Sequence, residues 1–74
     1  MDSQISARME MQRVRFLRLK EVQQLTALSR PSIYRLEAAG KFPKHVKVTA
    51  RASRWRADQI QTWIEQRTAD SQGA

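Results

Sequence analysis

The sequence contains no cysteine, and this absence excludes disulfide bonds and thiolate metal sites. Its one histidine, His45, has no second histidine or cysteine with which to complete a zinc site. No apolar run approaches the roughly 20 residues that a membrane span needs, and the N-terminus lacks the apolar stretch of a signal peptide. We therefore expect a cytoplasmic protein without a metal, a cofactor or a membrane-spanning segment.

Glycine and proline occur only twice each, and no glycine-rich loop that could cradle a phosphate is present. The sequence also lacks a Ser/His/Asp set and a cluster of metal-ligating side chains. A chain of 74 residues forms one domain at most. Such a chain buries only about 60% of the surface that its unfolded form exposes. Because it has no room for a deep pocket between two lobes, we do not expect an enzyme.

Acidic side chains are scarce: seven Asp and Glu stand against fourteen Lys and Arg, which gives a net charge of +7. Residues 30–56 hold eight basic and one acidic side chain, whereas residues 57–74 hold one basic and three acidic. A positive field confined to one segment is typical of a protein that binds a polyanion such as DNA. The alternative is a basic surface that serves solubility, but solubility requires no such clustering and is served at least as well by acids.

The first half of the chain predicts two helices. Residues 1–15 are polar with isolated apolar positions, and we expect a flexible N-terminal arm that orders on a partner. Within residues 20–27, apolar positions recur at spacings of three and predict one apolar helix face. The members of this face are Val22, Leu25 and Leu28.

A second helix is predicted over residues 30–39. Ser29 is a favourable N-cap for it, and Pro31 lies in its first turn, where the missing N–H carries no cost. The helix ends at Gly40, because glycine readily adopts the left-handed conformation of a helix C-terminus. Two helices joined by a short turn form a helix-turn-helix.

A β-hairpin is predicted after Pro43 breaks the helical pattern. Residues 45–48 and 53–56 alternate and predict two strands, which residues 49–52 join as a loop. A two-stranded hairpin is barely stable alone, so it must pack against the helices. The residues expected to make this contact are Val46, Val48 and Trp55.

The flanking segments complete the predicted fold. Residues 16–19 are expected to be extended, and residues 57–67 predict a third helix with Trp63 on its apolar inner face. The polar residues 68–74 are expected to form a disordered tail. The fold class is therefore mainly α with a small β-hairpin, a winged helix-turn-helix over residues 16–67.

The second predicted helix carries side chains suited to reading DNA. A helical repeat of about 100° per residue points Ile33 and Leu36 to the core. The other side, near the N-terminal end, is the part that a helix-turn-helix presents to base edges in the major groove. Arginine can bond guanine at two acceptors, serine can bond a phosphate or a base, and tyrosine offers a ring and a hydroxyl. The side chains on this side are Arg30, Ser32, Tyr34 and Arg35.

These side chains also have structural alternatives. Tyr34 can pack beneath the hairpin as an ordinary core residue. Arg30 and Arg35 can form salt bridges with Glu37 or Glu65, although exposed pairs contribute only about 0–1 kcal/mol. We favour DNA contact for both arginines.

The predicted hairpin and its approach are strongly cationic. Strand alternation places Lys47, Arg54 and Arg56 opposite the valines and Trp55, with Arg51 at the loop tip. Such a hairpin can lie along a phosphate backbone or enter the minor groove, where arginine is favoured. The alternative, charges that protect an edge strand from aggregation, accounts for Lys47 but not for the whole set. The cations between residues 41 and 56 are Lys41, Lys44, Lys47, Arg51, Arg54 and Arg56.

Several of these runs resemble the AlpA family of phage-associated regulators. They are LRLKEV at 17–22, LSRPSIYRL at 28–36, GKFPK at 40–44 and RWR at 54–56, followed by the apolar positions of the third helix. Proteins of that family are similar to excisionases and to the DNA-binding domain of MerR regulators. The likeness covers roughly residues 16–67.

The resemblance implies a winged helix-turn-helix that acts at mobile genetic elements of bacteria or phages. Arg30, Ser32, Tyr34 and Arg35 match the family's recognition helix, and residues 47–54 match its wing. One departure is Leu19, where relatives often carry a Thr or Ser cap. The chain lacks the effector-binding extension of full MerR proteins, so a small-molecule sensor is not expected.

The leading hypothesis is a sequence-specific double-stranded-DNA-binding transcriptional regulator. Its second helix would enter the major groove, and its wing, residues 45–56, would contact the backbone or the minor groove. The first alternative is an excisionase that bends attachment-site DNA for an integrase. A further alternative is a protein-interaction adaptor, which the acidic third helix and the N-terminal arm favour. RNA binding is less favoured, because no aromatic platform on a sheet is predicted.

The partners that we expect are double-stranded DNA, an integrase or RNA polymerase, and further copies of the chain that associate weakly on tandem sites. When bound to DNA, the protein would lie with the nucleoid. The predicted DNA contacts are Arg30, Ser32, Tyr34, Arg35, Lys41, Lys44, Lys47, Arg51 and Arg54.

Overall fold

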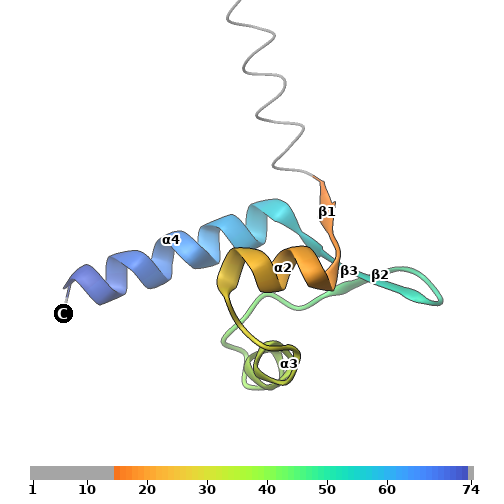
Figure 1. Ribbon diagram of the computed structural model, residues 1–74, viewed down its shortest axis with the longest axis horizontal. Coiled ribbons are helices and arrows are strands. Elements are labelled where there is room, and N and C mark those ends of the chain that lie inside the picture. Colours follow the sequence, from red (N-terminus) through yellow and green to blue (C-terminus); the bar gives the residue numbers. More distant parts are fainter. Residues whose placement is uncertain (1–14, 74) are drawn as a thin grey trace, which may run out of the picture.

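The computed structural model describes residues 15–73, with side chains to residue 71, so nearly all of the predicted arm lies outside the described residues. Within this range the fold is a winged helix-turn-helix, mainly α with a small antiparallel sheet, as predicted. Figure 1 shows the hairpin extending to one side of α2, α4 extending to the other, and α3 beneath. The elements are β1 (Phe16–Leu17), α2 (Leu19–Thr26), α3 (Arg30–Ala38), β2 (Val46–Thr49), β3 (Ala52–Arg56) and α4 (Ala57–Gly73).

Helix α2 starts without the Thr or Ser cap that relatives often carry, as the departure noted in the sequence implies. The Glu21 carboxylate accepts a hydrogen bond from the backbone N–H of Arg18 at 3.0 Å and forms an ion pair with Arg15 at 3.4 Å. It also lies in the first turn, where the helix dipole favours negative charge. The N-cap residue is Arg18, and Leu19 is the first residue of the helix, so Glu21 stabilises the start of α2 from within its first turn.

The turn between the two helices depends on Ala27, whose φ of 59° lies in the left-handed region. This conformation costs a non-glycine residue roughly 1–2 kcal/mol. Two hydrogen bonds offset the cost: the Ala27 N–H donates to the Gln23 carbonyl at 2.8 Å, and the Leu28 N–H donates to Thr26 Oγ1 at 3.3 Å. The same threonine hydroxyl donates to the Val22 carbonyl at 2.8 Å. The turn is consequently held by local polar contacts.

Helix α3 begins and ends as its sequence predicts. Ser29 Oγ accepts from the backbone N–H of Ser32 at 3.3 Å, and Pro31 lies in the first turn. After Ala38 the chain turns through Gly40, whose φ is 72°, and the N–H of Lys41 donates to the carbonyl of Leu36 at 2.8 Å. Helix α3 is therefore bounded by a side-chain cap at its start and by a glycine after its end.

The sheet has three strands in the order β1-β3-β2, and the pairing of β1 was not predicted. In the antiparallel β1–β3 pair, Phe16 lies opposite Arg56 and Leu17 lies opposite Trp55. The N–H of Ala57 also donates to the Arg15 carbonyl at 2.9 Å. The N-terminal strand therefore anchors the base of the wing.

Every element except β2 contributes a buried apolar side chain to one core. Five of these side chains are at most 1% exposed, and Phe42, which precedes the wing, is 5% exposed. Burying such a side chain contributes about 1.5–3 kcal/mol. The core residues are Leu17, Val22, Ile33, Phe42, Trp55 and Ile60.

The predicted inward orientation of Val46 and Val48 is wrong, since each is 41% exposed. The register pairs Val46 with Arg54 and Lys47 with Ser53, and an irregularity follows at Val48. Residues directly opposite one another share a face, so Val46 lies on the face opposite Trp55. Only Trp55 of the three predicted contacts is buried in the core.

Two further predictions need correction. The prediction that Leu25 belongs to the apolar face of the first helix is wrong, since Leu25 is 53% exposed. At 100° per residue, Leu19 and Leu25 lie on opposite sides of the buried Val22. The core lies on the side of Leu19, so Leu25 faces solvent. The polar tail predicted from residue 68 is wrong up to residue 73, since α4 continues to Gly73. No helix within residues 15–73 has both the length and the apolar character needed to cross a membrane.

Candidate nucleic-acid interface

The N-terminal end of α3 presents a small hydrogen-bonded set of polar side chains. Ser29 Oγ donates to Ser32 Oγ at 2.9 Å, and the Arg35 guanidinium donates to the same Ser32 oxygen at 3.3 Å. Arg35 is exposed and its side chain reaches back toward the start of the helix. The guanidinium is therefore held at the end of α3 that a helix-turn-helix presents to base edges.

Tyr34 lies between the surface and the core. It is half-buried, packs against the core cluster, and meets Trp55 and His45 edge-on at ring-centroid distances of 6.1 and 5.7 Å. The Arg30 guanidinium lies 5.7 Å from the centre of its ring. Tyr34 thus packs beneath the wing, the alternative considered from the sequence, while its outer part stays accessible beside Arg30.

The alternative in which Arg30 and Arg35 pair with Glu37 or Glu65 is wrong. Within the described part of the chain, neither arginine lies within 4.0 Å of a carboxylate. Glu37 is turned inward and is only 5% exposed, and Glu65 accepts a hydrogen bond from Gln61 at 3.2 Å. Both guanidinium groups therefore keep their charge available to a ligand.

The wing cations lie on both faces of the hairpin, contrary to the prediction of one cationic face. Lys47 lies opposite Ser53 and so shares the face of Trp55, whereas Arg54 lies opposite Val46 on the other face. Lys47 and Arg51 are exposed, with Arg51 in the turn at the tip, and Arg54 is half-buried and donates to the Ser53 carbonyl at 2.9 Å. A hairpin with cations on both faces matches the phosphates that border a groove on both sides.

Arg56 differs from the other cations of the hairpin. Its guanidinium donates two hydrogen bonds to the Asp58 carboxylate, at 3.0 and 2.8 Å. This pair joins the end of β3 to the first turn of α4 and neutralises one of the six cations counted between residues 41 and 56.

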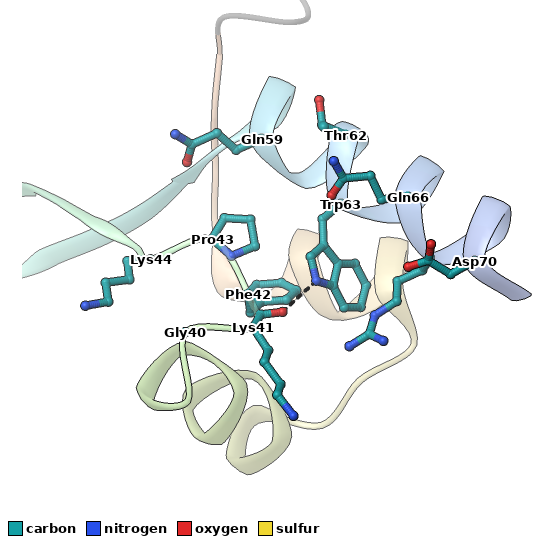
Figure 2. A pocket seen from close by; sticks show the side chains of 11 residues that line it. Gly40, Lys41, Phe42, Pro43, Lys44, Gln59, Thr62, Trp63, Gln66 and Asp70 are labelled. Carbon is teal, nitrogen blue, oxygen red and sulfur yellow. Dashed lines mark hydrogen bonds between the residues drawn. The ribbon is translucent and has the colours of Figure 1, made fainter.

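Lys41 and Lys44 follow the C-terminal end of α3, a helix of nine residues about 13 Å long that begins at Arg30. Both are exposed and line an open groove of about 680 Å³ between residues 40–44 and α4. Figure 2 shows the indole N–H of Trp63 donating to the Lys41 carbonyl, at 2.8 Å. Trp63 also meets Phe42 edge-on at 4.8 Å, so α4 fixes the backbone that carries the two lysines.

The sequence did not reveal the role of Glu37 and His45. Two nitrogens of His45 contact Oε1 of Glu37. They are the backbone N–H, at 3.1 Å, and ring Nδ1, at 2.7 Å. A signal was present, because Glu37 is the one acidic residue among eight basic ones between residues 30 and 56. A lone acid in a strongly basic segment suggests a specific internal contact.

Comparison of the sequence with known proteins identifies a family. The profile of the family described as Prophage CP4-57 regulatory protein (AlpA) matches residues 15–68, which include every described element except the last residues of α4. A curated relative, the "Uncharacterized protein ORF88" of Enterobacteria phage P4, is 38% identical over 55 residues. The match spans 74% of this chain and 62% of that protein, so the chain covers somewhat under two thirds of the relative's length. The chain belongs to the AlpA family of prophage regulatory proteins, a family of DNA-binding regulators.

Proposed function

We propose that this protein is a sequence-specific double-stranded-DNA-binding transcriptional regulator of a phage or another mobile genetic element. In this proposal α3 enters the major groove with its N-terminal end, and the hairpin of β2 and β3 contacts the backbone or the minor groove. The protein acts by binding and not by catalysis.

The observation that carries the proposal is the separation of charges. In the described residues, seven cations on α3, the connection and the hairpin have no carboxylate within 4.0 Å, whereas the exposed acids lie on α4 or in local pairs. Cations free of internal partners supply the phosphate contacts that dominate DNA affinity. The seven are Arg30, Arg35, Lys41, Lys44, Lys47, Arg51 and Arg54.

Two substitutions test the division of labour between helix and wing. Arg35→Ala should weaken binding by about 1–3 kcal/mol and relax base preference at one position, because a bidentate contact to a base is lost. Lys47→Ala should weaken binding to all sequences alike, because a phosphate contact carries no sequence information. Affinities for a selected site and for its single-base variants measure both effects. Equal losses with unchanged base preference would contradict this division.

The excisionase alternative uses the same surface, so the readout must separate the two activities. A circular-permutation bending assay on the attachment site of the element reports recombination geometry. A promoter–reporter assay at the genes beside its own reports transcriptional control. Regulation without a large bend supports a promoter regulator, whereas a large bend together with integrase-dependent excision favours the alternative.

Protein partners are a separate part of the proposal. An integrase or RNA polymerase, and further copies of this chain on tandem sites, are the partners that we propose alongside DNA. A pull-down that Arg35→Ala leaves unchanged, together with no shift of any duplex, would instead favour the adaptor alternative.

A further inference from the structure

Glu37 is a buried carboxylate that connects the recognition helix to the start of the wing. It lies on α3 and is 5% exposed, and its partner His45 immediately precedes β2. The backbone N–H of His45 donates to Oε1 at 3.1 Å, while ring Nδ1 lies 2.7 Å from Oε1 and 3.1 Å from Oε2. Three contacts to one carboxylate fix both the backbone and the ring of His45 relative to α3.

The aromatic neighbours extend this connection in both directions. The His45 ring lies 5.7 Å from Tyr34 of α3 and 5.6 Å from Trp55 of β3, and these two rings lie 6.1 Å apart. Arg30 covers the Tyr34 ring from the outside. A continuous set of contacts therefore runs from the N-terminal end of α3 to strand β3 and to the residue that precedes β2.

A purely structural role explains this arrangement poorly. Removing a carboxylate from water costs several kcal/mol even when it is paired, and well-packed apolar residues often stabilise a core at least as well. What the pair supplies is a defined geometry between two elements. Strand β3 is held by β1, α2 and α4, whereas β2 packs mainly on β3, so the Glu37 contact ties the β2 side of the wing to α3.

We propose that Glu37 and His45 are positioning residues that latch the wing to the recognition helix, so that α3 and the wing contact DNA at the same time. The proposal rests on the proposed function. Neither residue touches DNA in it: the latch acts through Lys47 and the other wing cations. Opening it leaves a folded core with a wing that no longer adds its phosphate contacts to those of α3.

The test is whether the latch controls the contribution of the wing. In the wild-type protein, Lys47→Ala should weaken binding by about three- to tenfold. In the Glu37→Leu background, where no side-chain oxygen remains to hold His45, the same substitution should cost less than about twofold, because two coupled changes are not additive. Arg35→Ala should cost the same factor in both backgrounds. Fluorescence anisotropy at one salt concentration gives all the affinities, corrected for the folded fraction from circular dichroism.

Two controls separate the latch from charge and from folding. Glu65→Gln removes the same charge from the exposed surface of α4 and should leave the Lys47→Ala factor unchanged. The pair His45→Asn and His45→Ala provides a rescue, because the asparagine Nδ2 can occupy the place of ring Nδ1. Asparagine should retain the Lys47→Ala factor, whereas alanine should reduce it. If Glu37→Leu does not fold, this pair decides the question.

The outcomes are distinct. A Lys47→Ala factor that is equal in wild-type, Glu37→Leu and His45→Ala proteins overturns the latch and leaves the proposed function intact. Failure of the wild-type protein to bind any duplex overturns both. A reduced factor in Glu37→Leu and His45→Ala, with rescue by His45→Asn, supports the latch.

Discussion

Removing two wing cations should make DNA binding less sensitive to salt by a calculable amount. Lys47 and Arg51 are exposed, and neither has a carboxylate within 4.0 Å among the described residues. With Arg35 assigned to a base, six of the seven available cations remain for phosphates. Each phosphate contact contributes about −0.9 to the slope of log K against log salt concentration, so the wild-type slope should be about −5.4.

The corresponding affinities follow from this slope. Between 50 and 200 mM salt the wild-type protein should lose affinity by about 2,000-fold. The Lys47→Gln/Arg51→Gln protein, with a slope of about −3.6, should lose only about 150-fold. Titrations by fluorescence anisotropy at four or more salt concentrations measure both slopes on one duplex.

A matched control removes two charges from elsewhere. In the Arg56→Gln/Arg67→Gln protein the net charge changes by the same amount. Arg56 is already bonded to Asp58, however, and Arg67 lies 5.0 Å from the ring centre of Trp63 on α4. Its slope should stay within about 0.5 of the wild-type value. If both double variants lower the slope equally, net charge and not the wing determines the salt dependence, and the reasoning is refuted.

Four stability predictions can be checked by thermal or urea denaturation followed by circular dichroism. Ser29→Ala removes the cap of α3 and should cost about 1 kcal/mol, or about 4–8 °C in Tm; an unchanged Tm would contradict the cap. Ile33→Ala, at a fully buried position, should cost about 2–5 kcal/mol and leave little folded protein at 37 °C; a near-native Tm would place Ile33 outside the core. Gly40→Ala should cost about 1 kcal/mol through its φ of 72° alone, since no atom lies within 4 Å of the added Cβ; Gly40→Asn should cost less. Val46→Thr and Val48→Thr should each change stability by less than about 0.5 kcal/mol, and a loss above 1 kcal/mol would restore the inward orientation expected from the sequence.

The helix-turn-helix could be predicted from the sequence because its signals are local. Ser29, Pro31 and Gly40 act on backbone groups within a few residues of themselves, and all three lie where the sequence places them. The segregation of charge is also a property of the linear chain. These features needed no knowledge of distant contacts.

The wing could be predicted only in outline, because strand register is not a local property. Alternation within one strand does not show whether Val46 and Val48 share a face with Trp55 on the other strand. That depends on how the two strands pair, and a shift of one residue exchanges the faces. The irregular pairing after Lys47 and the additional strand β1 both affect this register. The prediction that all wing cations share one face failed for this reason.

The contacts of the candidate interface show the same limit. The predicted residues Ser32, Arg35, Arg30 and Tyr34 lie together on α3, but the partner of Glu37 is eight positions away, across Gly40 and Pro43. The Trp63 contact to the Lys41 carbonyl spans 22 positions. Neither pairing has a spacing that a helix or strand pattern predicts.

By itself the sequence determined the two helices, the caps of α3 and the placement of positive charge in the middle of the chain, since each depends on neighbouring residues. The tertiary structure alone decided which face of the wing is buried, that β1 completes the sheet, and that the lone acid of the basic segment joins α3 to the wing. These outcomes depend on contacts between residues far apart in the sequence, whose energies are fixed only when the whole core closes.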